Sequence, residues 1–387
     1  MAQLVPLPAD SLPTNCANVY VAVELSRSNW IVAVHAPALG DKVSSHQLAG
    51  GDVAHLLSVI DRVCRQVAHT GHAEPIAYCC YEAGYDGFWL HRLLLAHGIR
   101  NFVLDAASLL VDRRAKRAKT DHLDARSLLR ALIGLSQGDT YGCRAVRVPT
   151  VDEEDARRLH RERQRLVRER TGHINRIKAL LSAQGIRALR ITDKTWLNRL
   201  GRLRTGDGRP LPAQLRAEIA RQWRRLMLLE EMRRQVEAER DGLLRGNTGA
   251  DQSVGNIQRL AKLKGIGPEF ATIFAREVFY RHFSNRRQVG SYLGLAPCPY
   301  NSGSSRRDQG ISKAGNPRAR TAAIEMAWMW LRYQPNSALS QWYRNRVGTM
   351  EGRIRRILIV GLARKLVIAL WRYVSTGLVP TGAIIET

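Results

Sequence analysis

Two carboxylates, Asp121 and Asp124, stand three residues apart at the start of a stretch rich in good helix formers. Thr120 can cap a helix at this point, which would place both acids in its first turns and on one face. A basic run directly precedes them, formed by Arg113, Arg114, Lys116, Arg117 and Lys119. An acid pair within a basic run suits a site that holds a divalent cation and a nucleic-acid backbone together. The alternative is a solvent-exposed, capped helix whose acids only favour its first turn.

Two more acids lie near the ends of predicted strands. Segment 19–26, VYVAVELS, is rich in β-branched residues and contains Glu24, and segment 29–37 follows as the second strand of a hairpin. Segment 76–84, IAYCCYEAG, is predicted as a buried strand that ends at Glu82. Because the carboxyl ends of strands gather the chemistry in α/β sheets, these acids would meet Asp121 and Asp124 if their strands are neighbours.

Four converging carboxylates repel one another unless cations offset their charge. Two Mg²⁺ ions about 3.5–4 Å apart are the usual solution in phosphodiester chemistry. Each acid also has a simpler explanation, since Glu24 could be a surface residue at a strand end and Glu82 could open a turn. The four together favour a metal site.

The remaining elements of the first third predict an α/β domain over residues 18–148. Segment 52–67 carries an apolar stripe of helical period. A second helix is predicted before Gly98, which stops it, and a short strand follows in segment 101–108. The N-terminus lacks the basic and apolar regions of a secretory signal.

The middle, residues 149–250, is predicted to be helical. Segments 151–185 and 212–245 carry narrow apolar seams, which favour an antiparallel coiled coil or a dimerising arm. A helical hairpin packed on its own domain is the alternative. The first helix is covered with arginines that favour nucleic-acid contact, among them Arg161, Arg165 and Arg168.

The C-terminal third, residues 251–387, is predicted to be mainly helical. Gly265 and Gly267 lie in a turn between two helical segments, typical of a helix-hairpin-helix unit whose backbone N–H groups approach a phosphate. Segment 291–320 is rich in Gly, Ser, Asn and Pro, so much of it is predicted as loop, and it carries Arg306, Arg307 and Lys313. A serine there could act as a nucleophile. A phosphate-binding loop without covalent chemistry is the alternative. Four tryptophans of the closing helices are predicted to be core: Trp328, Trp330, Trp342 and Trp371.

Charge and cysteine usage narrow the class of protein. The 387 residues contain 60 Lys and Arg against 34 Asp and Glu, a formal net charge of +26, which makes nucleic acid the leading partner. A membrane surface is second, but no lysine-rich amphipathic helix stands out. The apolar segment 357–374 is interrupted by Arg364, Lys365 and Arg372, so it is predicted to be a core helix rather than a membrane span. Six cysteines without CxxC or zinc spacing are typical of buried thiols in a reducing cytosol.

The ordered combination of these motifs resembles one family over about residues 19–345. The matching stretches are VAVELS, YEAG and KTDHLDA in the first third, then KGIGP, GLAP at 294–297, SG at 302–303 and ISKAGN at 311–316. The chain is similar to the DEDD transposases of the IS110 insertion sequences, which include Piv-like DNA invertases.

The resemblance implies an RNase H/RuvC-like N-terminal domain that binds Mg²⁺ through Glu24, Glu82, Asp121 and Asp124. It also implies a C-terminal transposase domain whose serine, Ser302 in the SG motif, attacks a DNA phosphate covalently. Ser304 and Ser305 stand close by, so the choice of nucleophile stays open. The family's first acid is usually Asp, whereas Glu24 keeps the charge and reaches one methylene further.

We therefore predict a transposase or site-specific recombinase of a mobile element that cuts and rejoins DNA. The resemblance further implies an element-encoded guide RNA that pairs with DNA, a homo-oligomer (dimer or tetramer), and action at the nucleoid in a bacterial cytoplasm. Ser302 follows Asp121 by 181 residues, so acids and serine can meet only through tertiary or quaternary contact. The alternatives are a Holliday-junction-type metal-dependent endonuclease and a non-catalytic nucleic-acid binder.

Overall fold

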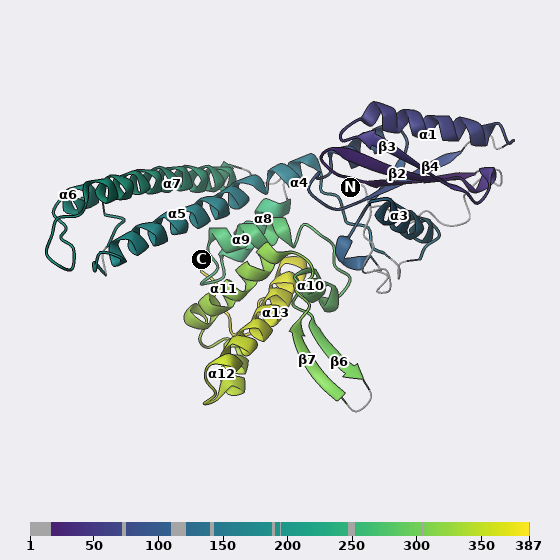
Figure 1. The fold of residues 1–387 in the computed structure, drawn as a ribbon. Coiled ribbons are helices and arrows are strands. Elements are labelled where there is room, and N and C mark those ends of the chain that lie inside the picture. The colour runs from purple at the N-terminus through teal and green to yellow at the C-terminus, as the bar shows by residue number, and fades with distance from the viewer. Residues whose placement is uncertain are drawn as a thin grey trace. The chain divides into compact units, whose positions relative to one another are not determined.

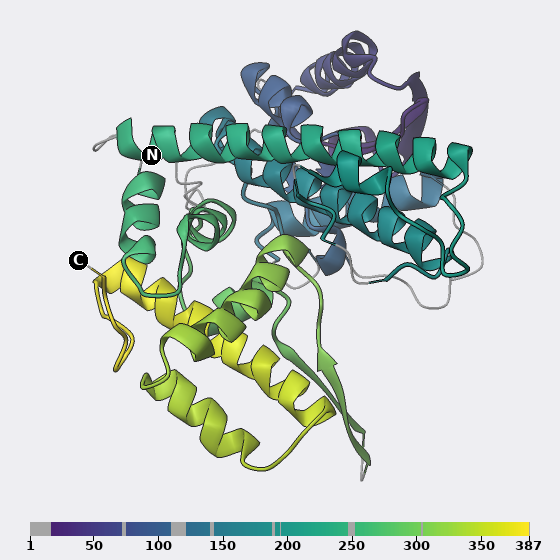
Figure 2. The same cartoon turned by 90° about the vertical axis from the view of Figure 1, so that its left-hand side faces the viewer.

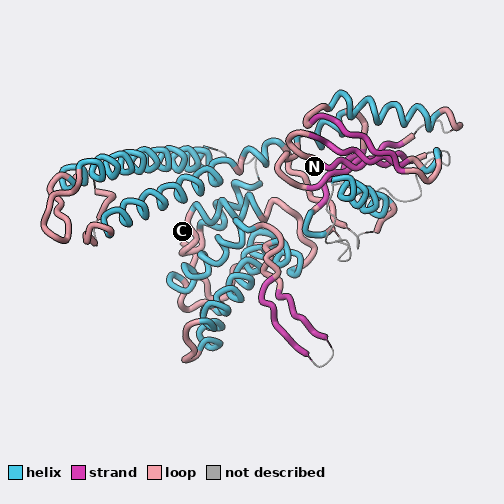
Figure 3. Tube along the Cα trace, in the orientation of Figure 1, coloured by secondary structure: helices cyan, strands magenta, loops and turns pink. Residues whose placement is uncertain are grey.

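The computed structural model describes residues 17–71, 75–109, 121–139, 143–187, 190–193, 195–246, 252–302 and 305–386. The chain divides into two compact units, Met1–Val148 and Pro149–Thr387, and each is described by itself. The first is a mixed α/β unit and the second is mostly helical, as predicted (Figure 3). None of the helices in the described ranges is long and apolar enough to cross a membrane.

The first unit is built on a five-stranded sheet in the order β3-β2-β1-β4-β5. The strands are β1 (Asn18–Glu24), β2 (Asn29–His35), β3 (Val43–Ala49), β4 (Ile76–Glu82) and β5 (Arg100–Leu104). β1, β2 and β3 pair antiparallel, whereas β1, β4 and β5 pair parallel. The hairpin of β1 and β2 is confirmed, and so are the strands that end near Glu24 and Glu82.

Helices cover both faces of this sheet (Figure 1). On one face, α1 (Val53–Ala68) and α2 (Trp89–Ala96) pack against Val19, Val21 and Val23 of β1. On the other face, α3 (Asp121–Ser136) packs against Tyr20 and Ala22. Alternate residues of β1 therefore enter two separate apolar cores, which explains why the strand is apolar throughout. Two short 3-10 turns, Pro37–Leu39 and Ala106–Ser108, complete the unit.

In the second unit, the two long amphipathic helices that were predicted are present, but their bounds differ from the predicted ones. The segment predicted as one helix is divided into α4 (Val151–Asp155) and α5 (Arg158–Ser182). The break lies at Arg157, whose side chain is buried and donates from Nε to the Arg276 carbonyl oxygen at 3.0 Å. Turning the chain here lets a guanidinium enter the protein, a tertiary contact that helical periodicity does not reveal.

α5 lies beside α7 (Ala213–Gly246), with the short α6 (Trp196–Leu200) between them in sequence (Figures 1 and 2). Three ion pairs join the two helices: Arg163–Glu237, Arg170–Glu230 and Arg176–Glu218. The residue numbers rise along α5 while those of the partners on α7 fall, so the two helices are antiparallel. They form a hairpin within the chain, around the buried seam residues Leu166, Ile177, Ile219 and Leu226. Met232, predicted in the seam, is instead 43% exposed at its edge. A coiled coil and a dimerising arm stay predictions.

Among the described residues, the rest of this unit packs six helices around one core and carries a pair of strands beside them. They are α8 (Gln252–Ala261), α9 (Pro268–Glu277), α10 (Arg286–Tyr292), α11 (Pro317–Tyr333), α12 (Ala338–Val347), α13 (Arg353–Thr376) and a strand pair, β6 (Pro297–Ser302) with β7 (Ser305–Ile311). Of the four tryptophans predicted to be core, only Trp330 is fully buried. Trp342 and Trp371 are half-buried, and Trp328 is 40% exposed, because each ring meets the core along only one side.

Glu277, at the end of α9, joins three helices of this unit through one buried carboxylate. It accepts hydrogen bonds from His160 Nε2 at 2.9 Å and from Arg161 Nε and Nη2 of α5 at 2.7 and 3.0 Å. Asn316 and Arg318, at the start of α11, contact it at 3.2 and 3.4 Å. Burial alone would raise the pKa of the Glu277 carboxyl, but the hydrogen bonds from His160 and Arg161 outweigh it and hold that pKa well below its usual range.

Replacing this carboxylate should be costly at neutral pH and less so in acid. Glu277→Gln removes the buried negative charge that bonds to buried His160 and half-buried Arg161, so we expect a loss of about 3–5 kcal/mol in the free energy of unfolding at pH 7. Because the folded pKa of Glu277 is depressed, its contribution is fully present above the unfolded pKa, about 4.3, and is lost as pH falls through the folded value. Urea unfolding at pH 7, 5 and 3 measures the difference.

Glu230 supplies a matched control on α7. It also pairs with arginines, Arg170 and Arg233, but its side chain is more exposed than that of Glu277. Glu230→Gln should cost about 0–1 kcal/mol. Equal losses in the two variants, or a Glu277→Gln loss that stays constant from pH 7 to pH 3, would contradict a special role for Glu277.

Candidate functional site

The parallel pairing of β1 with β4 brings two of the predicted acids to one edge of the sheet. Val23 of β1 pairs with Tyr81 of β4, so the next residues along the two strands, Glu24 and Glu82, end neighbouring strands at the same level. Both acids therefore stand at the carboxyl ends of adjacent parallel strands, as predicted from the strand pattern.

Strand alternation places Glu24 and Glu82 on the face that α3 covers. Tyr20 and Ala22 of β1 and Tyr78 and Cys80 of β4 pack under α3. Glu24 and Glu82 continue these same alternating series by one step. Ile31, which pairs with Glu24 across β2, belongs to the same apolar cluster.

Helix α3 runs antiparallel to β1, so its first turn lies toward the ends of the strands that carry Glu24 and Glu82. At its C-terminal end, the Ser136 hydroxyl contacts the Tyr20 hydroxyl near the start of β1, at 3.4 Å. At its N-terminal end, His122 Nδ1 lies 2.9 Å from the hydroxyl of Ser45. Ser45 pairs with Ala33 of β2, and Ala33 pairs with Ala22, which lies close to the end of β1. The helix therefore delivers its first residues to the edge where Glu24 and Glu82 stand.

Asp121 and Asp124 occupy the sheet-facing stripe of this helix. They precede buried Ala125 and Leu128 by one turn each, so they continue the stripe beyond the apolar core. Asp121 and Glu82 are exposed, while Glu24 and Asp124 are half-buried. We name Glu24, Glu82, Asp121 and Asp124 the acidic edge.

The donor chemistry of the acidic edge fits a hard divalent cation. All four side chains offer carboxylate oxygens, the ligands that Mg²⁺ prefers. In the described ranges, no three His, Cys, Asp or Glu side chains lie close enough together to ligate one ion. The longer, more mobile side chains of Glu24 and Glu82 are those that must move to complete a coordination sphere.

The sequence analysis did not single out Asp105, which directly follows β5. This strand lies beside β4, so Asp105 comes to the same end of the sheet. Its backbone N–H donates to the Arg144 carbonyl oxygen at 2.8 Å. Leu104 packs under α3, so alternation places Asp105 out of phase with the acidic edge. The sequence signal was the same as for Glu24, an acid at the end of an apolar strand.

The predicted basic residues fall into three groups. Arg113, Arg114, Lys116 and Lys119 lie outside the described residues. Arg161 is engaged within the fold, because both of its bonded nitrogens contact the buried Glu277. Arg165 and Arg168 are exposed on α5, and within the described residues neither has a carboxylate within 4.0 Å. They are the arginines of this group that stay available for a nucleic-acid backbone.

The two glycines of the predicted helix-hairpin-helix turn differ in their local roles. Gly265 has a φ of 86°, and a Cβ there would lie 2.8 Å from Cβ of Tyr333, so packing on α11 requires glycine. Gly267 is the N-cap of α9, with ordinary extended backbone and open space where a Cβ would stand. Phosphate contact by this turn stays a prediction.

Ser302 is the last residue of β6, the first strand of a β-hairpin that lies where loop was predicted. It pairs with Ser305 across the ladder, so only Gly303 and Ser304 separate the strands, and those two residues lie outside the described ones. The backbones of Arg306 and Arg307 pair with Asn301 and Tyr300. The side chains of residues 300–308 are not described. The strand pair extends from the helices of its unit and places Ser302 at its far end (Figures 1 and 3).

Two glycines hold the base of this hairpin. Gly294 has a φ of 65°, and a Cβ there would lie 2.1 Å from the carbonyl oxygen of Ala314. Gly315 has a φ of 99°, and its Cβ would lie 2.2 Å from the carbonyl oxygen of Tyr292. The N–H of Lys313, itself exposed and at a φ of 57°, donates to the Gly294 carbonyl oxygen at 3.1 Å. The GLAP and ISKAGN motifs thus fit together at the root of the hairpin.

Comparisons with known proteins match both units. Residues 19–184 match a family model described as a transposase of the DEDD type, and residues 257–342 match the model "Transposase IS116/IS110/IS902 family". A putative transposase, y4rJ, of Sinorhizobium fredii is 46% identical over 95% of both chains. A probable family 20 transposase of Pseudomonas aeruginosa is 30% identical over 78% of this chain and 84% of its own. The transposase for insertion sequence element IS1111A of Coxiella burnetii is 27% identical over 66% of each chain.

If the acidic edge binds a divalent cation, we expect the stability of the chain to depend on that cation. A ligand that binds only the folded state stabilises it by about 2.7 kcal/mol at one hundred times its dissociation constant, so Mg²⁺ should raise the melting temperature. In Asp121→Asn and Asp124→Asn that increase should disappear. Without Mg²⁺ both variants should melt at or above the temperature of the unmodified chain, because repulsion among the carboxylates is relieved. Differential scanning calorimetry with and without Mg²⁺ measures both effects.

Asp61→Asn is the matched control. Asp61 lies on α1 in the same unit, exposed and paired with Arg65. Its variant should keep the full Mg²⁺-dependent increase. If all three variants respond to Mg²⁺ like the unmodified chain, the cation binds elsewhere.

Proposed function

The chain belongs to the IS116/IS110/IS902 family of transposases, and we propose that it cuts and rejoins insertion-sequence DNA with its acidic edge and Ser302. The observation that supports this proposal is that β1 and β4 end beside each other in Glu24 and Glu82, on the sheet face that is covered by α3, the helix that carries Asp121 and Asp124 in its first turn. On the face under α3, the buried apolar residues of β1 and β4 end at Ala22 and Cys80, and the next residues on that face are Glu24 and Glu82.

In the proposed reaction, the acidic edge holds a divalent cation, with Mg²⁺ as the ion that its carboxylates suit. Such a cation withdraws charge from phosphate oxygens and favours the transition state of phosphoryl transfer. The carboxylates themselves orient the ion, and one of them can accept the proton that leaves an attacking hydroxyl.

Ser302 supplies the attacking group. Its hydroxyl oxygen forms a bond to phosphorus, while the bond from phosphorus to one deoxyribose oxygen breaks and that oxygen takes up a proton. Attack of a deoxyribose hydroxyl on the phosphoserine then restores a phosphodiester and releases the serine. The hairpin supports this role, because Gly294 and Gly315 fix its base and two residues at most separate Ser302 from Ser305 at its end.

The partners follow from the proposed family activity. DNA is the substrate, an RNA encoded by the element selects the sites by base pairing, and the chain works as a homo-oligomer. The excess of cationic residues, +26 in net charge, supports binding of polyanions of either kind.

The serine assignment predicts a covalent protein–DNA intermediate. With end-labelled DNA and the element's RNA, the unmodified chain should give a protein–DNA adduct that survives denaturing electrophoresis. Ser302→Ala should retain DNA binding and the response to Mg²⁺ but lose the adduct, because no other group at this position can bond to phosphorus.

Ser304→Ala and Ser305→Ala are the controls for this assignment. Each should lower the yield of adduct much less than Ser302→Ala does. An adduct that persists in Ser302→Ala but fails in one of the others would move the nucleophile. Metal-dependent cleavage with no adduct in any of these proteins would instead identify an endonuclease. The absence of both cleavage and adduct would identify a nucleic-acid-binding protein without catalysis.

Exposed arginines on α5 should set the salt dependence of nucleic-acid binding. Each phosphate contact contributes about −0.9 to the log–log slope of affinity against salt for duplex DNA. Arg165→Gln/Arg168→Gln should therefore flatten the slope by up to about 1.8. The slope is measured by fluorescence anisotropy with duplex DNA, at salt concentrations from about 50 to about 300 mM.

Arg163→Gln/Arg170→Gln is the matched control on the same helix. Both of these arginines pair with glutamates of α7. Their removal should lower stability and leave the slope unchanged. Equal slopes in all three proteins would place the nucleic acid away from this face of α5.

A further inference from the structure

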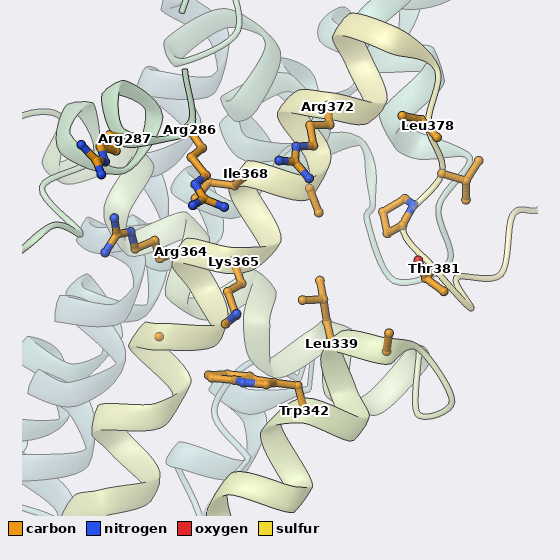
Figure 4. A pocket seen from close by; sticks show the side chains of 15 residues that line it. Arg286, Arg287, Leu339, Trp342, Arg364, Lys365, Ile368, Arg372, Leu378 and Thr381 are labelled. Carbon is orange, nitrogen blue, oxygen red and sulfur yellow. The ribbon is translucent and has the colours of Figure 1, made fainter. Parts of the chain in front are cut away.

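A pocket in the C-terminal helices gathers cations that the proposed reaction does not use. Its volume is about 730 Å³, and its lining comes from α10, α12, α13 and the segment after α13 (Figure 4). Five cationic side chains line it, and no acidic one does: Arg286, Arg287, Arg364, Lys365 and Arg372. The stripe of α13 that carries three of them was predicted only as core helix.

These cations are not neutralised by the protein. Within the described residues, none of the five has a carboxylate within 4.0 Å. This contrasts with α5, where Arg161, Arg163 and Arg170 all meet glutamates. Like charges gathered without counter-charges repel one another, so the pocket favours a polyanionic ligand.

One of these cations lies close against the backbone of α10. A Cβ on Gly290 of α10 would lie 2.9 Å from Nε of Arg364, so the missing side chain lets the guanidinium cross against α10. Arg286 and Arg287 lie at the start of that same helix. Figure 4 shows the three guanidinium groups on one side of the pocket, and Arg372 two turns further along α13. Arg364 and Arg372 are eight residues apart, about 12 Å along the helix.

The opposite side of the pocket is flat and apolar. Trp342 of α12 lines it beside Leu339, and Leu378 and Val379 continue the apolar surface after α13. The ammonium of Lys365 stands 4.7 Å from the centre of the Trp342 ring (Figure 4). Lys365 is exposed, so its side chain can swing away from the ring to meet a phosphate.

We propose that this pocket binds an unpaired nucleic-acid strand, with a base on Trp342 and phosphates on the cations of α10 and α13. Proteins that bind single strands without reading their sequence place cations along the phosphate backbone and aromatic side chains against the bases. Thr381 is the only uncharged side chain of the lining with a hydroxyl, so deoxyribose and ribose strands should bind alike. The proposal rests on the proposed function only for the presence of nucleic acid, since the binding itself needs neither cation nor chemistry.

The test measures binding of labelled dT12 and U12 to the full chain by fluorescence anisotropy in EDTA over a series of salt concentrations. Lys365→Gln/Arg372→Gln should flatten the salt slope for both strands by about 1.4, because each single-strand contact contributes about −0.7. Arg355→Gln/Arg356→Gln removes the same charge from exposed positions of α13 outside the pocket. This control should change the slope much less.

The platform is tested separately. Trp342→Leu should weaken both strands about 5- to 100-fold, the range expected for the loss of one stacked base, and Trp342→Phe should restore most of the affinity. Circular dichroism and melting curves check that the variants fold. Photo-crosslinking of strands that carry 5-iodouracil should label the peptide that contains Trp342.

The outcomes separate this proposal from the proposed function. Equal slopes in the two double variants, or crosslinks confined to other peptides, would overturn the pocket proposal whether or not the chain cleaves DNA. Similar affinities for U12 and dT12 that Lys365→Gln/Arg372→Gln weakens alike would support it, and a strong preference for either strand would contradict the equal binding expected from the lining. Because the measurements are made in EDTA, they do not depend on whether the acidic edge binds a cation or is active.

Discussion

The parallel pairing of β1 with β4 is the constraint on which the proposed chemistry depends. It brings Glu24 and Glu82 to the same level at one edge, and α3, which runs against β1, delivers Asp121 and Asp124 to that edge. The proposal thereby places four negative charges beyond Ala22 and Cys80, the last buried apolar residues of β1 and β4 on this face. Such an arrangement costs free energy through repulsion, which a bound cation offsets. Two apolar cores fix the sheet between its helices and so hold the strand ends in place.

Arginines in the second unit serve two opposite purposes. On α5, Arg161, Arg163 and Arg170 are bound to glutamates, and one of these, Glu277 of α9, also accepts a hydrogen bond from Asn316 at the start of α11. Other cations have no carboxylate partner among the described residues, notably Arg165 and Arg168 on α5 and the five that line the pocket. Net charge alone does not separate these groups. Their geometry does, because a partnered guanidinium stabilises the fold while an unpartnered one can hold phosphate.

Strand composition was sufficient to predict β1, β2 and β4, and hence the position of Glu24 and Glu82 at strand ends. Thr120, the predicted cap of α3, lies outside the described residues, and the acidic edge stays a prediction as a metal site. β3 was missed because VSSHQLA is half-exposed at the border of the sheet and fully buries only Leu48. The hairpin of β6 and β7 was predicted as loop, since its glycines and prolines suggested irregular structure, whereas Gly294 and Gly315 are needed for close packing at its base. The break before α5, the Glu277 cluster and the pocket arise from contacts between distant segments, which periodicity in one segment cannot reveal. The cations of α13 interrupted an apolar run, and only the packing of α10 and α12 beside them made a pocket.

The central claim is that the acidic edge is a divalent-cation site of an insertion-sequence transposase. Its most direct test is an anomalous difference map from crystals of the full chain grown with Mn²⁺, which takes carboxylate ligands like those of Mg²⁺. We expect a peak among the carboxylates of Glu24, Glu82, Asp121 and Asp124, with metal–oxygen distances of about 2.0–2.2 Å, close to those of Mg²⁺ sites. Strong anomalous peaks elsewhere, with none at this edge, would contradict the account.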